Sequence, residues 1–189
     1  MEQLVVKVVD GFIARGIIAQ GDKKIYEFGL RQGISIILNL VTIIVIGIFS
    51  GELWNLTIFS VAYLWLRPYA GGYHAETDLG CYLFSTILII MVVFVSKVVV
   101  MNFQFIVVLM FSISVMLLIA PVEDHRKLLD EMEVKIYKEK LRRRLLFELL
   151  IIMLGSYWNR SIDMIIVAII VATLMTIFGW IKNERSMGV

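Results

Sequence analysis

"LGCYLFSTILIIMVVFVSKVVV", residues 79–100, decides the fold, because its 22 residues hold a single charged side chain, Lys97. A helix needs about 20 predominantly apolar residues to cross the hydrocarbon of a bilayer. This stretch therefore predicts a membrane-spanning helix. The whole chain fits that prediction, because 60% of its 189 residues are hydrophobic and only 18% are charged, unlike a soluble globular domain. We expect an all-α, polytopic membrane protein that forms a single domain over residues 1–189.

Further apolar stretches flank this one and bring the expected number of transmembrane helices to about six. The six candidate spans are 32–50, 52–67, 79–100, 103–121, 145–158 and 162–181. The stretches 52–67 and 145–158 are short for a span. We expect snorkelling side chains such as Arg67 and Arg144, or local thinning of the bilayer, to make up the missing length.

The distribution of basic residues predicts the orientation of these spans. With the N-terminus inside, 16 of the 18 Lys and Arg residues fall on the cytoplasmic side, and only Lys97 and Arg160 fall outside. Cytoplasmic segments of membrane proteins carry such an excess. We therefore expect a multi-pass protein of the cell membrane, with both termini and residues 67–78 at the cytoplasmic face. Eight of the basic residues lie in 122–144, which we interpret as a basic cytoplasmic loop.

Residues 1–31 precede the first span and show a different pattern. Their apolar side chains recur at helical spacing, at Leu4, Val5, Val8, Val9, Phe12 and Ile13. This spacing predicts an amphipathic helix lying in the membrane interface, ahead of a transmembrane core over residues 32–189. Gly21 and Asp22 interrupt the pattern, and a second short helix is expected over residues 22–31. The region either anchors the protein to the membrane surface or also docks another amphipathic peptide.

The segment 67-RPYAGGYHAETDLGC-81 separates the second span from the third. Pro68 and the Gly71–Gly72 pair disfavour a continuous helix, so we expect a bend or a re-entrant loop. Thr77 or Asp78 is a natural N-cap for the third span. Cys81 would then lie in the first turn of that helix, where the helix dipole and a nearby imidazole favour the thiolate.

His74 and Cys81 are the candidate catalytic pair of this segment. On a straight helix they would lie about 10 Å apart, so contact requires the chain to fold back between them. Asp78 and Glu76 are candidate groups to orient His74, although a simple helix cap is the commoner role for a residue placed as Asp78 is. A lone cysteine in a membrane protein is commonly a packing residue and a lone histidine commonly a structural one, so the pattern leaves these readings open as well.

Metal, disulfide and nucleic-acid chemistry are not expected. Cys81 is the sole cysteine, which excludes an intramolecular disulfide and a multi-cysteine zinc site. The chain holds only two histidines, and His125 falls in the charged stretch, where we expect it to be solvated. We therefore expect no metal, no cofactor and no nucleic-acid partner.

The segment 67–81 also resembles the signature of the accessory gene regulator B (AgrB) family, in which an Arg, a Gly-Gly, a His and a Cys stand at this spacing between transmembrane helices. The sequence 120-APVED-124 resembles a later landmark of the same family. The resemblance implies a membrane-embedded cysteine endopeptidase of Gram-positive quorum sensing. Such enzymes cut the C-terminal tail from a small AgrD-like propeptide and close a thiolactone or lactone ring, and the resemblance also suggests a homodimer.

On this resemblance Cys81 is the nucleophile and His74 the base, while Arg67 and Gly72 match positions that support the site. The thiolate would form an acyl-enzyme thioester, which a side-chain nucleophile of the bound peptide then opens. Backbone N–H groups near Gly71, Gly72 or the start of the third span are candidate donors to the oxyanion.

The basic end of the 122–144 stretch has two interpretations. It either holds the protein at the anionic inner leaflet or captures an acidic propeptide tail through Arg142, Arg143 and Arg144. Two other classes of function stay open for the chain, a small transporter and a non-enzymatic membrane adaptor. A transporter is expected to carry charges within its spans, and here the spans hold few charged residues away from Lys97 and Asp163.

Overall fold

The computed structural model describes residues 2–73, 75, 77–98, 103–122, 129–155 and 160–187. The regular secondary structure of the described residues is helical, apart from one isolated bridge between Gly71 and Val122, and the expected all-α class is confirmed. The helices are α1 (Glu2–Ala14), α2 (Lys23–Ser50), α3 (Leu53–Ala70), α4 (Asp78–Val98), α5 (Phe103–Ile119), α6 (Glu131–Gly155) and α7 (Asp163–Met187), with short 3-10 turns η1 (Gln20–Asp22) and η2 (Arg160–Ile162).

Three of the described helical segments are long and apolar enough to cross a membrane. They are Gln20–Ser50, Asp78–Val98 and Asp163–Glu184, and α5 is a shorter apolar helix. Several long apolar helices of this kind fit a multi-pass membrane protein. Each of the six expected spans falls on one helix from α2 to α7, although their boundaries differ.

Two expectations about local structure are wrong. Residues 23–31 are not a separate short helix, because α2 runs unbroken from Lys23 to Ser50. Residues 131–144 are not part of a loop, because they form the first half of α6. Asp130 and Glu133 cap the start of that helix, because the Asp130 N–H donates to Glu133 Oε2 at 3.2 Å and Asp130 Oδ1 accepts from the Glu131 N–H at 2.7 Å. An ion pair between Glu139 and Arg143, one turn apart, supports the helix further along.

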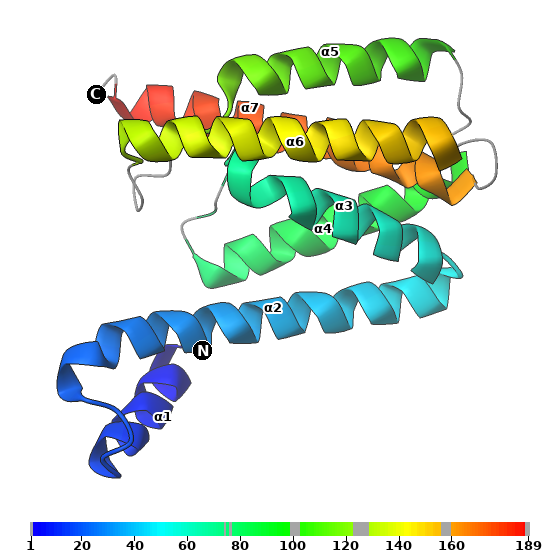
Figure 1. Ribbon diagram of the computed structural model, residues 1–189. Coiled ribbons are helices and arrows are strands. Elements are labelled where there is room, and N and C mark those ends of the chain that lie inside the picture. The colour runs from blue at the N-terminus through cyan, green and yellow to red at the C-terminus, as the bar shows by residue number, and fades with distance from the viewer. Residues whose placement is uncertain are drawn as a thin grey trace.

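Figure 1 shows α7 packed among α3, α5 and α6, with α2 and α1 lying to one side of this bundle. In α7, 61% of the apolar span is buried, against 6% in α2. The core accordingly lies around α7, and its fully buried side chains include Phe59, Leu66, Met116, Leu141, Ile166 and Ile169. The exposed apolar side chains of α2 are suited to contact with lipid.

One end of the bundle gathers several chain segments. In Figure 1 the start of α2, the α3–α4 connection, the start of α6 and the end of α7 all lie at this end. At the opposite end α2 turns into α3 at Gly51, whose φ of 73° is the left-handed conformation that favours glycine. The segments that carry the candidate site therefore meet at a single end of the molecule.

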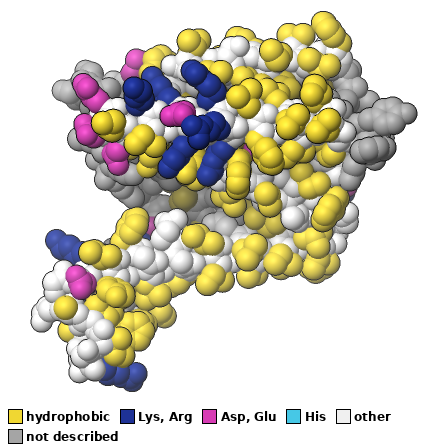
Figure 2. Space-filling model, viewed as in Figure 1, with side chains coloured by type: hydrophobic (Ala, Val, Ile, Leu, Met, Phe, Trp, Pro, Cys, Tyr) yellow, Lys and Arg dark blue, Asp and Glu magenta, His cyan; other side chains and the backbone are white. Residues whose placement is uncertain are grey.

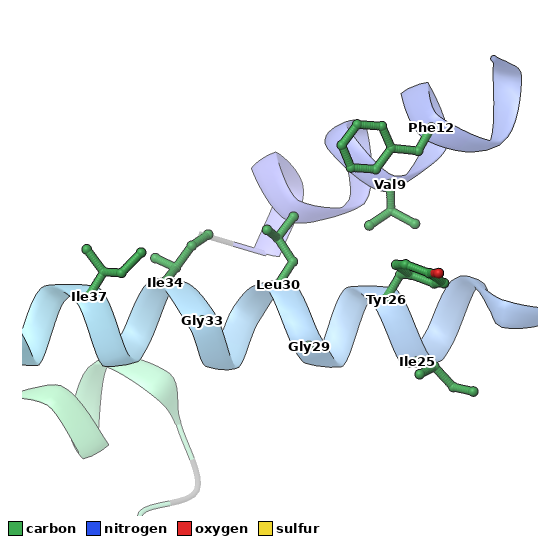
Figure 3. Close-up of a pocket in the computed structure, with 9 residues that line it drawn as sticks. All are labelled: Val9, Phe12, Ile25, Tyr26, Gly29, Leu30, Gly33, Ile34 and Ile37. Carbon is green, nitrogen blue, oxygen red and sulfur yellow. The ribbon is translucent and has the colours of Figure 1, made fainter. Parts of the chain in front are cut away.

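The amphipathic helix expected near the N-terminus is present as α1. Its residues Val5 and Val9 are almost completely buried. The interruption before α2 is also present, and an ion pair of 2.5 Å between Asp10 and Lys23 spans it. Figure 3 shows Val9 and Phe12 of α1 beside Tyr26 and Leu30 of α2, around an apolar groove of about 520 Å³.

Candidate active site

The site is built at the turn that ends α3. This helix continues through Pro68 to Ala70, and the next two residues, Gly71 and Gly72, have φ of 72° and 130°. Such conformations favour glycine, because a Cβ atom is strained there. The expected bend between the second and third spans is therefore confirmed.

Arg67 fastens this turn from within α3. Its guanidinium donates through Nη1 to the carbonyl of Gly71 and through Nη2 to the carbonyl of Tyr73, the second bond measuring 2.7 Å. A guanidinium presents its donors as a rigid fork, so one side chain fixes two carbonyls of the loop together. Arg67 thus positions the backbone immediately before residue 74.

Two distant segments hold the same loop from outside. The N–H of Val122 donates to the carbonyl of Ala70 at 3.1 Å, and the N–H of Tyr73 donates to the carbonyl of Met175 in α7 at 2.9 Å. A Cβ atom added at Gly179 would lie 2.5 Å from the carbonyl carbon of Gly72. Only glycine at position 179 lets the backbone of α7 approach the loop so closely.

Sequence reasoning missed Met175 and Gly179. Met175 contributes only its backbone carbonyl, so no residue type could have indicated it. Gly179 did carry a signal, because a glycine inside an apolar helix often marks a close approach of two backbones. The sequence contains nothing that identifies the partner backbone.

Cys81 occupies the position expected for it in α4. Thr77 is the N-cap, because its Oγ1 accepts a bond of 3.1 Å from the N–H of Gly80 and its carbonyl accepts one of 3.0 Å from the N–H of Cys81. The Cys81 side chain is exposed in the first turn of the helix.

Asp78 has an ion partner in α2. Its Oδ2 lies 3.7 Å from Nε of Arg31, which connects the start of α4 to α2. His74 and Glu76, the expected base and its second candidate orienter, lie outside the described residues, as does His125. Among the described residues no group of three or more His, Cys, Asp and Glu side chains could hold a metal ion.

The three arginines at the end of the basic stretch lie in different surroundings. Arg144 donates to the carbonyl of Trp65, and its guanidinium carbon lies 4.4 Å from the Trp65 ring centroid and 4.1 Å from that of Tyr69. It therefore joins α6 to α3. Arg142 and Arg143 are exposed, and Figure 2 shows Lys and Arg side chains gathered over this part of α6.

The family model of accessory gene regulator B (AgrB) matches residues 5–180. The chain belongs to the AgrB family. This is a family of peptidases that process the AgrD propeptide. The match runs from α1 into α7 and includes the whole Arg67–Cys81 segment. A comparison with curated proteins finds no match, and a comparison with solved structures finds none either.

Proposed function

We propose that this protein is a membrane-embedded cysteine endopeptidase that cuts the C-terminal tail from an AgrD-like propeptide and closes the remaining peptide into a ring. One observation carries the proposal. The thiol of Cys81 is exposed in the first turn of α4, beside a loop that Arg67 and α7 hold rigidly. Family membership supplies the class of substrate.

The first step forms a thioester on the enzyme. The thiolate of Cys81 attacks the scissile carbonyl carbon, the C–N bond breaks, and His74 transfers the thiol proton to the departing amine. The N-terminal end of α4 favours the negative charge on sulfur. The N–H groups of Gly80 and Cys81 are bonded to Thr77, so the first-turn donors left for the oxyanion are those of Asp78 and Leu79.

The second step closes the ring. A thiol or hydroxyl of the bound peptide gives its proton to His74 and attacks the thioester carbonyl, a new thioester or ester forms, and Cys81 leaves as thiolate. Exchange between thioesters is nearly balanced in energy, whereas hydrolysis is strongly downhill, so the site must keep water away from the intermediate. A site at the edge of a membrane excludes water in this way.

We further propose six spans over α2 to α7, with both termini and Cys81 at the cytoplasmic face and α1 in the interface. The 16 to 2 excess of basic residues supports this orientation. The positions of the helix ends in Figure 1 support it too, because the segments assigned to the cytoplasmic face lie at one end of the bundle. The family resemblance suggests a homodimer, and the exposed apolar face of α2 offers a surface for it.

Capture of the acidic propeptide tail is assigned to the basic half of α6. The exposed side chains of Arg142 and Arg143 are available to a carboxylate. Arg144 contributes by holding α6 against Trp65 and Tyr69 of α3.

Tail cleavage by a Cys81→Ala variant tests the proposal. Cleavage of a co-expressed AgrD-like propeptide should be lost, whereas a Ser85→Ala variant, altered one turn further along α4, should retain it. Both proteins should accumulate in the membrane equally. A transporter or an adaptor would keep its activity without the thiol, so wild-type tail cleavage by the Cys81→Ala protein would overturn the proposed enzyme.

A further inference from the structure

A hollow of about 440 Å³ lies against the candidate active site. It is lined by Tyr73, Phe84, Phe178, Ile181 and Lys182. These residues come from the loop before His74, from α4 and from α7. Its volume falls within the roughly 300–1,000 Å³ of ligand pockets, and its walls are mainly aromatic and aliphatic.

One wall of the hollow, Phe84, lies on α4 about one turn beyond Cys81. Phe84 follows Cys81 by three residues, so the two share a face of α4 about 4.5 Å apart along the helix axis. The ring of Tyr73 lies 5.5 Å from that of Phe84, centroid to centroid. The bond from the Tyr73 N–H to α7 fixes that residue in place.

One wall of the hollow carries a positive charge. The ammonium of Lys182 lies 5.3 Å from the centroid of the Tyr73 ring, in cation–π contact. An apolar side chain on a peptide, followed by polar backbone, matches both the aromatic walls and this charge.

We propose that this hollow is the subsite for a large apolar side chain on the peptide residue whose carbonyl Cys81 attacks. The inference rests on the proposed function and adds to it the side-chain preference of the enzyme. After the tail has left, only the acyl part of the substrate remains on Cys81. An apolar side chain seated among Tyr73, Phe84 and Phe178 would hold that acyl group in place and shield the thioester from water until the ring closes.

Two reagents of matched reactivity test the subsite on the full-length protein in detergent micelles. Acetyl-phenylalanine chloromethyl ketone and acetyl-alanine chloromethyl ketone both alkylate a thiol with loss of chloride, and they present a benzyl or a methyl group at the acyl-side position. We expect Cys81 to react at least about tenfold faster with the phenylalanine reagent. Phe178→Ala and Phe84→Ala should each reduce that preference, whereas Phe94→Ala, an exposed position on α4 outside the hollow, should leave it unchanged.

A variant whose thiol is moved to another position of α4 distinguishes binding of the reagent in the hollow from partition of the reagent into the micelle. Leu79 lies in the same turn of α4 as Cys81 but on the opposite face, and it is exposed. A Leu79→Cys, Cys81→Ser variant reports the preference due to partition alone. An equal preference at both positions would mean that the hollow is only a lipid-facing surface, and the subsite would be refuted.

The outcomes distinguish this inference from the proposed function. A preference at Cys81 that depends on Phe178, in a protein that never cleaves a propeptide, would support the subsite and reject the peptidase. If the protein cleaves a propeptide but Phe178→Ala and Phe84→Ala leave its preference for the phenylalanine reagent unchanged, the subsite is rejected and the peptidase is retained.

Discussion

Gly179→Ala should disable the enzyme without unfolding it. The added Cβ would lie 2.5 Å from the carbonyl carbon of Gly72 and 2.8 Å from the nitrogen of Tyr73, where ordinary contact begins at 3.4 Å. The loop would have to retreat by about 0.9 Å, because both obstacles are backbone atoms. That shift stretches the 2.9 Å bond from Tyr73 to Met175 beyond hydrogen-bonding distance. We expect overpacking to lower the free energy of unfolding by about 1–3 kcal/mol.

Activity should fall further than stability. A displacement of about 1 Å in a catalytic group can cost roughly 100-fold in rate, and His74 directly follows the displaced Tyr73. We therefore expect the kcat of propeptide tail cleavage in proteoliposomes to fall by about 10–100-fold. The unfolding midpoint of the same protein in detergent should show that it stays folded.

Gly155→Ala is the matched control. Its added Cβ would meet Cδ1 of Ile162, the flexible end of a side chain, at the junction of α6 and α7. Stability should fall by a similar or smaller amount, and kcat should stay close to that of the wild-type protein. A Gly179→Ala protein with wild-type kcat would refute the argument that α7 positions the catalytic loop.

Three more predictions follow from the other contacts of the site. Arg67→Lys keeps the charge but can reach only one of the two loop carbonyls, so tail cleavage should fall about tenfold or more while membrane insertion is unchanged; full activity of this variant would contradict the positioning role. Exchanging Arg142 and Arg143 for Glu should raise the KM for a propeptide with an acidic tail and leave the unfolding midpoint unchanged. Arg144→Glu should instead lower the free energy of unfolding by about 2 kcal/mol, because Arg144 loses its contacts with two aromatic rings. A membrane-impermeant thiol reagent should label Cys81 only after cells are permeabilised, and labelling of intact cells would overturn the proposed orientation.

Local chemistry made part of this structure predictable. The charge-poor run after Cys81 predicts α4, and the Gly71–Gly72 pair predicts the bend. Thr77 is a predicted cap of α4, and its hydroxyl oxygen does accept a hydrogen bond from the N–H of Gly80. Each of these features depends on residues that are neighbours in the sequence. The pattern therefore placed Cys81 in the first turn of a helix without knowledge of any other segment.

Other features depend on which segments meet and could not be read locally. The basic stretch 122–144 was interpreted as a loop, because polar residues in a membrane protein fit either a loop or the part of a helix that extends beyond the membrane. The capping pair Asp130 and Glu133 was the signal for a helix. The stacking of Arg144 on α3 and the contact of Gly179 with Gly72 join residues more than 70 positions apart. Helical periodicity gives the faces of each helix but not their partners.

The covalent intermediate provides the most direct measurement of the central claim. A propeptide whose ring-forming nucleophile is replaced by Ala cannot open the thioester, so it should accumulate on Cys81 as an adduct visible in the mass of the intact protein and removed by neutral hydroxylamine. The His74→Ala protein should form little of this adduct, since the departing amine would lose its proton donor. Rapid release of the hydrolysed peptide with no adduct on Cys81 would contradict the account, because an enzyme that passes its acyl group directly to water cannot be the proposed cyclase.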